Sequence, residues 1–326
     1  MYKLNFNECK NIEIYKKKNI IAHYMIDFVT LVFNHPTEIE LLKLQATSFQ
    51  YCEPEFVGKI FIFYNDNGNN NIEFLKDYYP KNLLSKVNII YRDNIFNKGQ
   101  KSSWINQQYF KLYISNYVES KYYVILDGKN HFIRKVNLND FIKNDKPKLY
   151  LNNPGEMIQY YRNCLEYFKI KDPFEYKYND DNSQAIGNSI LLTTTPYIFI
   201  TQQVKNMIKY VESKEKKSFY NFFMKNTSIT EFYLYSTYLI FSNNIDKHEM
   251  VQKDNFVVTI FHNPNANWNK YKDKKIAITN SKVKVFGLHR AAVENMDNNY
   301  KNNLLTLYSN FFDKKTCDMI KSFMYH

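Results

Sequence analysis

The first half of the chain alternates between short apolar runs and amphipathic stretches. Apolar runs of strand length lie at residues 25–33, 57–64, 86–91 and 122–127, and stretches with helical spacing lie at 37–49 and 101–118. Strands that alternate with helices at such short spacing are typical of βαβ units and a parallel sheet. We therefore expect an α/β fold with a mostly parallel central sheet flanked by helices.

The fourth apolar run ends in a distinctive way. The sequence Tyr-Tyr-Val-Ile-Leu at 122–126 leads directly into Asp127, Gly128, Lys129 and Asn130. A run without polar alternation is typical of a strand buried on both faces, and the carboxyl ends of such strands line the ligand crevice in open α/β sheets. Because an unpaired carboxylate is costly to bury, we expect Asp127 to lie at the mouth of a crevice.

The second half of the chain is less regular, and a more irregular α+β arrangement is expected there. Helices are predicted at 155–168, 228–241 and 298–312, and strands at 185–193, 256–261 and 282–286. The pair Thr195-Pro196 is expected to open a further helix that continues through Glu212, because proline suits the first turn of a helix.

The chain has neither a linker rich in Gly, Ser or Pro nor an internal repeat. We therefore expect one continuous domain over residues 25–312, with a nucleotide-binding first half at 25–136 and a second half at 137–312. Residues 1–24 are predicted to be a leader, and residues 313–326 a C-terminal tail.

Composition and charge narrow the class of protein. Hydrophobic residues make up 44% of the 326 residues, enough for a sizeable core, and the net charge of +12 favours anionic partners. The lysine runs contain no arginine and suit solvated faces better than a nucleic-acid site. Four scattered cysteines without Cys-x-x-Cys spacing are typical of reduced cytosolic thiols, not of a zinc cage.

Several enzyme classes lack their signature here. The chain contains no Gly-x-Gly-x-x-Gly, no Walker phosphate loop and no Gly-x-Ser-x-Gly elbow. These absences weigh against a dinucleotide dehydrogenase, a P-loop kinase and an α/β-hydrolase. The sequence also has no apolar stretch of signal-peptide or membrane-span length, so we expect a soluble cytoplasmic protein that is at most peripheral at the inner face of the membrane.

Four stretches in order resemble glycosyltransferases of the GT-A fold, and more narrowly an uncharacterised bacterial family found with surface-polysaccharide genes. Residues 104–112 are similar to a Gln-Gln-x-x-Lys-Leu helix, and residues 123–134 stand where the family has Leu-Asp-Ala-Asp and an apolar-Arg-Pro tail. Residues 230–235 are similar to a Ser-Glu-Tyr-x-Leu-Tyr helix, and residues 287–290 end a late strand on His-Arg. Order and spacing agree from about residue 26 to residue 312.

The resemblance implies transfer of a sugar from a nucleotide-sugar donor to a glycan or lipid-linked acceptor. A GT-A enzyme carries Asp-x-Asp at this position, and its last carboxylate binds a divalent metal that bridges the donor diphosphate. This chain has Asp127-Gly128-Lys129 instead. A protonated lysine cannot bind Mg²⁺ or Mn²⁺, so we hypothesise that Lys129, helped by Lys111 and Arg290, replaces the metal at the leaving phosphate. Alternatively, Lys129 points to solvent, and Asp127, Asn130 or His289 holds Mn²⁺ or Mg²⁺.

The remaining site residues follow from the same four stretches. Asp127 is predicted to accept hydrogen bonds from sugar or ribose hydroxyls, while Gly128 lets the backbone approach the ligand. Of Asn130 and His131, only one can face the site, because neighbouring strand residues point to opposite faces.

Gln108 and Lys111 share one face of a helix and are predicted to reach the donor nucleotide or sugar, as are His289 and Arg290. Glu231 is the candidate general base that removes the proton of the acceptor hydroxyl. In a retaining reaction it would bind the donor sugar instead, and it could equally be a helix N-terminal charge that stabilises the dipole. The rival hypothesis is a catalytically inactive GT-A-like protein that binds a sugar or nucleotide.

Overall fold

The computed structural model describes residues 25–65, 71–95, 104–152, 158–173, 177–178, 185–186, 190–191, 194–252, 255–261, 275 and 278–325. The predicted leader at 1–24 lies outside the described residues. No helix in these ranges is both long enough and apolar enough to cross a bilayer.

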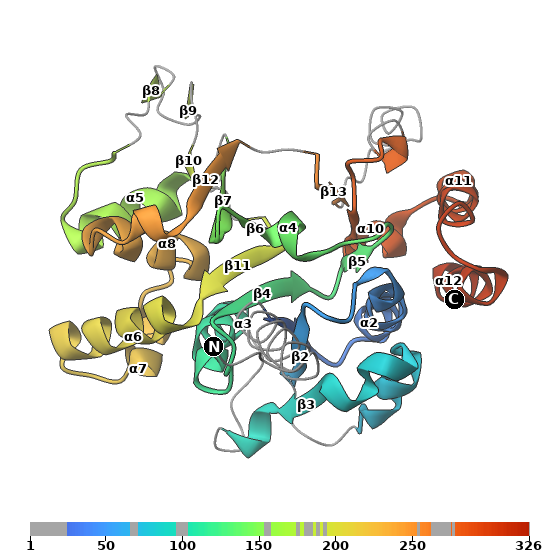
Figure 1. The fold of residues 1–326 in the computed structure, drawn as a ribbon, viewed down its shortest axis with the longest axis horizontal. Helices are drawn as coiled ribbons and strands as arrows, with labels where there is room; N and C mark the ends of the chain where they lie inside the picture. The colour runs from blue at the N-terminus through green and yellow to red at the C-terminus, as the bar shows by residue number, and fades with distance from the viewer. Residues whose placement is uncertain are drawn as a thin grey trace, which may run out of the picture.

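A five-stranded sheet with the order β11-β4-β1-β2-β3 forms the centre of the molecule (Figure 1). Its strands are β1 (Ile26–Val32), β2 (Val57–Tyr64), β3 (Val87–Tyr91), β4 (Tyr122–Asp127) and β11 (Tyr197–Ile200). The first four are parallel, and β11 pairs antiparallel with β4 at the edge. The predicted fold class, a mostly parallel central sheet flanked by helices, is therefore confirmed.

Two smaller sheets accompany the central one. The first contains β10 (Ile190–Leu191), β7 (Lys146–Asn152) and β12 (Glu249–Gln252), with β6 (Ile142–Lys143) beside β7, and the second contains β13 (Val257–Ile260), β14 (Val285–Leu288) and β5 (Asn130–Phe132). A separate two-stranded ladder joins β8 (Lys177–Tyr178) to β9 (Ala185–Ile186). The second small sheet is important for the site because β5 follows β4 after a two-residue turn.

Helices cover both faces of the central sheet. In chain order they are α2 (Pro36–Ser48), α3 (Trp104–Tyr113), α4 (Leu138–Phe141), α5 (Ile158–Phe168), α6 (Thr201–Glu215), α7 (Phe219–Lys225), α8 (Glu231–Phe241), α10 (Arg290–Asn295), α11 (Asn298–Tyr308) and α12 (Lys314–Tyr325). Short 3₁₀ segments lie at Phe49–Tyr51, Glu73–Tyr78, Lys81–Lys86, Arg92–Asn94, Ile114–Asn116 and Ile245–Lys247. In Figure 1, α2, α11 and α12 lie on one side of the sheet, and α5, α6, α7 and α8 lie on the other.

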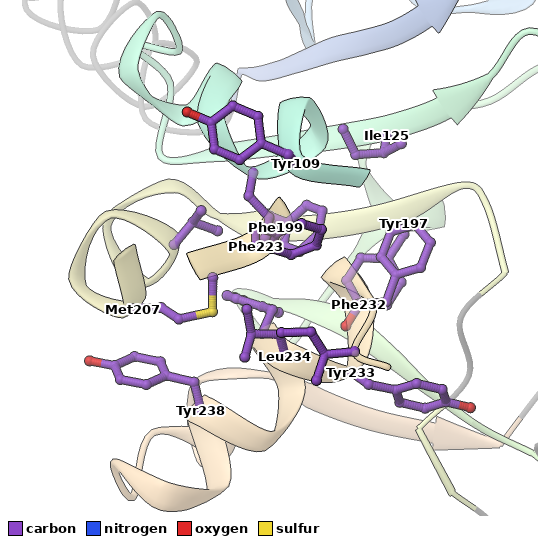
Figure 2. Packing of buried hydrophobic residues seen from close by; sticks show 14 of the residues in the cluster. Tyr109, Ile125, Tyr197, Phe199, Met207, Phe223, Phe232, Tyr233, Leu234 and Tyr238 are labelled. Carbon is purple, nitrogen blue, oxygen red and sulfur yellow. The ribbon is translucent and has the colours of Figure 1, made fainter. Parts of the chain in front are cut away.

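Alternation along the strands divides the core into two layers. In β4, Tyr123 and Ile125 pack into the layer with α3, α6, α7 and α8, whereas Tyr122, Val124 and Leu126 pack into the layer with α2. Aromatic residues fill the first layer, where Figure 2 shows Phe199 of β11 and Phe232 of α8 within the buried cluster. Helix α8 is buried along most of its length, as expected of a helix enclosed by other elements.

The structure corrects the prediction for Thr195-Pro196. Residues Tyr197–Ile200 form strand β11, and the helix begins only at Thr201. The run Tyr-Ile-Phe-Ile is apolar at every position and all four residues are buried, which fits a strand buried on both faces better than a first helical turn. Of the strand predicted at 185–193, Ala185–Ile186 belong to β9 and Ile190–Leu191 to β10, which lie in different sheets, and the other residues lie outside the described ones.

Residues Lys314–Tyr325 form helix α12. Helix α12 contacts α2 and α11, and buries Ile320 and Met324 in a third apolar cluster with Leu41 of α2. The predicted division into a domain and a tail stays a prediction, but this helix shares its core with the domain.

Candidate functional site

Asp127 ends β4 at the carboxyl edge of the central sheet. The five residues before it are buried, and the Asp127 side chain is 28% exposed. Its Oδ1 lies 3.1 Å from Nζ of Lys111, and its Oδ2 accepts hydrogen bonds from Thr195 Oγ1 at 3.0 Å and from Nζ of Lys129. Asp127 is therefore held between two ammonium groups at the strand end that the sequence predicted.

Lys111 brings a second carboxylate into the same network. Its Nζ lies 3.0 Å from Oε1 of Glu231, the first residue of α8, and 4.9 Å from the ring centroid of Phe232. Tyr123 Oη donates to the Lys111 carbonyl oxygen at 3.0 Å, which fixes α3 against β4. The Lys111 side chain is 12% exposed and that of Glu231 is 4% exposed. Residues 120 positions apart thus form a buried ion pair.

The two ammonium groups keep the Asp127 carboxyl ionised. Burial alone would raise the pKa of the Asp127 carboxyl, but Lys111 and Lys129 outweigh burial and hold the pKa well below its ordinary value. Burial likewise would lower the pKa of Lys111, but Asp127 and Glu231 raise it above its ordinary value. Both groups are therefore charged throughout the physiological pH range.

A further carboxylate, Glu38 of α2, lies on the other side of the Asp127 turn. A Cβ atom added to Gly128 would stand 3.1 Å from Glu38 Oε2, so the carboxylate lies directly against this glycine. Burial raises the pKa of the Glu38 carboxyl, although Arg290 and Lys129 partly offset it. The Lys129 ammonium in turn lies 6.0 Å from the ring centroid of Phe261.

Arg290 begins α10 beside Glu38. Its Nε lies 3.9 Å from Oε1 of Glu38 and 3.9 Å from Oε1 of Glu294, and its guanidinium lies 5.2 Å from the ring centroid of Phe33. Cations and carboxylates thus alternate from α3 across the end of β4 to α10. A site of this kind offers several fixed cations to an anionic ligand.

Buried polar groups brace the turn after β4. Gln45 of α2 donates from Nε2 to the carbonyl oxygens of Asp127 and Asn130, both at 2.8 Å, and accepts at Oε1 from Thr30 Oγ1 at 2.7 Å. Asn130 is fully buried, and its Oδ1 accepts from the Asp127 backbone N–H at 2.9 Å. These contacts fix the position of the Asp127 backbone.

The alternation predicted at the start of β5 is found. Asn130 faces the Asp127 turn, while His131 points into the third apolar cluster, where its Nε2 lies 3.0 Å from Tyr308 Oη. Burial lowers the pKa of His131 to about 3, so this imidazole is neutral.

His289 at the start of α10 and Gln108 within α3 are two other predicted site residues. His289 caps α10, because its Nδ1 accepts from the Ala291 backbone N–H at 3.2 Å, and its ring lies 6.1 Å from that of Phe261. Gln108 lies one turn before Lys111 in α3 and is 2% exposed. The roles predicted for Gln108, Asn130, His289 and Arg290 in donor binding stay predictions.

The described residues do not suit a divalent metal. Within them, no three His, Cys, Asp or Glu side chains are grouped so that they could hold a metal ion. The Asp127 carboxylate is in contact with two ammonium groups, and these would repel a metal ion at the same oxygens. The Mn²⁺ or Mg²⁺ site considered from the sequence therefore has no support in this part of the chain.

Sequence reasoning overlooked Glu38, Gln45 and Thr195. Glu38 stands in the first turn of α2, where a favourable interaction with the helix dipole is a sufficient local explanation. Gln45 could have been found from the sequence, since it lies three and four residues after Leu42 and Leu41 in the helix predicted at 37–49, which places a polar residue on an apolar face. The importance of Thr195 depends on β11 pairing with β4, which the sequence did not predict.

Taken together, the fold and the site define an α/β protein with a charged site at the carboxyl edge of a mostly parallel sheet. The chain belongs to a family described as a family of unknown function, DUF6492, whose model matches residues 37–290. This agrees with the resemblance to an uncharacterised family. A search of curated proteins gives no match.

Among the solved structures that match this chain in backbone fold are two glycosyltransferases. One is a crystal structure of the galactosyltransferase LgtC in complex with donor and acceptor sugar analogs, with 10% identity, a TM-score of 0.46, and coverage of 90% of this chain and 100% of that chain. The other is an apo structure of the bifunctional glycosyltransferase WbbM, with 10% identity, a TM-score of 0.43, and coverage of 91% of this chain and 51% of that chain. At these TM-scores neither likeness assigns a function to this chain.

Proposed function

We propose that this protein is a glycosyltransferase that moves a sugar from a nucleotide-sugar donor to a glycan or lipid-linked acceptor. One observation carries the proposal: two ammonium groups, of Lys111 and Lys129, converge on Asp127 at the carboxyl end of a central parallel strand. Ligands of open α/β sheets bind at this edge, and a fixed cation there can stabilise a developing phosphate charge.

The leaving group is the phosphate end of the donor nucleotide. When the bond between the anomeric carbon and the phosphate oxygen breaks, the electron pair stays on that oxygen. Lys129 and Arg290 stand on the α10 side of the Asp127 turn and can bind this charge in place of a divalent metal. Asp127 binds hydroxyl groups of the donor sugar, and the absence of a side chain at Gly128 leaves space for the Glu38 carboxylate against the turn.

Glu231 is assigned to the acceptor. Lys111 binds its Oε1, and Oε2 is the atom that would take the proton of the acceptor hydroxyl as the new glycosidic bond forms. Lys111 stays paired with Asp127 when Glu231 becomes neutral, so no buried ammonium is left alone. If the reaction retains the anomeric configuration, Glu231 would bind the donor sugar instead.

A catalytically inactive protein that binds a sugar or nucleotide is the second candidate. The observation in its favour is that Lys111, Lys129 and Thr195 already occupy both oxygens of Asp127. A closed network of this kind would have to open before Asp127 could bind a ligand.

We further propose that the acceptor is a growing surface polysaccharide or its lipid-linked precursor. The net charge of +12 would favour a peripheral position at the anionic inner face of a membrane, where such precursors are anchored.

Ligand-induced thermal stabilisation tests the proposal. UDP, GDP, CMP and their sugar conjugates are added to the chain one at a time, and the proposal expects a selective rise in melting temperature. Hydrolysis of the stabilising nucleotide sugar, or transfer from it, then separates an enzyme from an inactive relative. Asp127→Ala should remove the activity, while Asp246→Ala, at an exposed aspartate on a different segment, serves as the control. Absence of any selective nucleotide would refute the proposal.

A further inference from the structure

Helix α3 carries both an exposed aromatic ring, that of Trp104, and the buried ammonium group of Lys111. Trp104, Gln108 and Lys111 stand at positions i, i+4 and i+7, a spacing that places them in one row along a helix. The row changes in chemistry along its length, from an aromatic ring to an uncharged amide to an ammonium group. We refer to Trp104, Gln108 and Lys111 as the α3 row.

The outer end of the row is an exposed aromatic platform. Trp104 is 52% exposed, and its ring centroid lies 6.1 Å from that of Tyr160 in α5, with the planes 61° apart. Tryptophan offers a large, rigid apolar surface together with an N–H donor. Such a surface suits the flat C–H face of a sugar ring.

The middle of the row contains polar groups without partners. Gln108 is 2% exposed, and neither its Nε2 nor its Oε1 forms a hydrogen bond in the described part of the chain. Thr230, the residue before Glu231, is also 2% exposed, and its Oγ1 likewise forms no hydrogen bond within the described residues. Buried polar atoms in this state are rare, and they destabilise the fold. The hydroxyl groups of a sugar both donate and accept hydrogen bonds, as these atoms require.

The surroundings of the two Asp127 carboxylate oxygens differ in charge. Its Oδ2 side faces Lys129, near Glu38 and Arg290, which suits the anionic donor. Its Oδ1 side faces Lys111 and then the uncharged groups of the α3 row. Hydroxyl-rich, uncharged groups are therefore best accommodated along α3.

We propose that the α3 row is the binding surface for an acceptor oligosaccharide of at least two sugar rings. The accepting ring lies at Gln108 and Thr230, with its hydroxyl at Glu231, and the next ring stacks on Trp104. The row spans about 10 Å along the helix axis, since an α-helix rises about 1.5 Å per residue. This inference rests on the proposed function and names the acceptor as an oligosaccharide, not a monosaccharide or a small alcohol.

The inference is tested by binding of the full chain to an array of immobilised mono-, di- and oligosaccharides. We expect the wild-type protein to bind at least one glycan of two or more rings more strongly than its terminal monosaccharide. Trp104→Ala should weaken that binding about tenfold, in line with the loss of one aromatic stacking contact, and Trp104→Phe should recover most of it. Phe74→Ala removes another exposed aromatic side chain, which is 43% exposed and lies in a different segment, and should leave the pattern unchanged.

Two results would overturn the inference. One is the same array pattern for the wild type and for Trp104→Ala, which includes the case in which neither protein binds any glycan. The other is an equal loss in Phe74→Ala. Nucleotide stabilisation of the wild-type protein is measured in parallel. Stabilisation without any role for Trp104 overturns this inference alone, whereas Trp104-dependent glycan binding without stabilisation by any nucleotide overturns the proposed function.

Discussion

Replacement of Lys111 by methionine tests the charge network at its most buried point. Methionine keeps an unbranched side chain of similar length but removes the ammonium group. Asp127 would keep Lys129 and Thr195, whereas Glu231, 4% exposed, would lose the ammonium that lies 3.0 Å from its Oε1. Breaking a buried ion pair by removing one partner costs about 3–5 kcal/mol, and we expect a loss of about 3 kcal/mol because Asp127 stays paired.

Urea denaturation measures this loss. Adding Glu231→Gln to Lys111→Met should restore part of the stability, because the unpaired charge is then absent.

A cost of less than about 1 kcal/mol for Lys111→Met, a value usual for an exposed ion pair, would contradict a buried ion pair. So would simple addition of the Lys111→Met and Glu231→Gln effects. Glu231→Gln alone provides the matched comparison, since Lys111 then keeps Asp127 as its partner.

Three further substitutions give distinct outcomes. Gln108→Met removes two buried amide atoms that have no hydrogen-bond partner among the described residues, so it should raise the free energy of unfolding by about 1–2 kcal/mol in urea while weakening glycan binding. A loss of stability would contradict this. Glu38→Gln should raise the melting temperature at pH 7 but have little effect on it near pH 4, because burial raises the pKa of Glu38 and the carboxylate destabilises the fold only when it is ionised. A stabilisation on the order of 1 kcal/mol that is the same at both pH values would contradict this prediction. Asp127→Asn should reduce nucleotide-sugar hydrolysis by about a hundredfold or more, and near-normal hydrolysis would exclude Asp127 from the site.

The sequence predicted the elements that local patterns determine. The buried run before Asp127 identified the central strand and the end at which the ionic network lies, and the predicted bounds of β2 are those observed. Local pattern was misleading at Pro196, where a proline before an apolar run was interpreted as a helix start although the run pairs with β4. Only tertiary pairing distinguishes a short buried strand from a buried helical turn.

Side-chain partners were less predictable than elements. Lys111 and Glu231 were each singled out, but their pairing joins helices 120 residues apart and no local pattern encodes it. Glu38 stands in the first turn of its helix, where the dipole is a sufficient local explanation, whereas in the fold it lies against Gly128 beside Lys129. The alternation of Asn130 and His131 was predictable because strand geometry fixes it, while the choice of which one faces the site depended on the packing of β14 and α11.

Donor hydrolysis in the presence of EDTA tests the central claim most directly. The nucleotide sugar that stabilises the protein is incubated with wild type and with Lys129→Met, each with EDTA and with added Mn²⁺. If Lys129 stands in for the metal, wild-type hydrolysis is unchanged by EDTA, and Lys129→Met loses about a hundredfold or more under every condition. Loss of wild-type activity in EDTA with recovery in Mn²⁺, or full activity of Lys129→Met, would contradict the account.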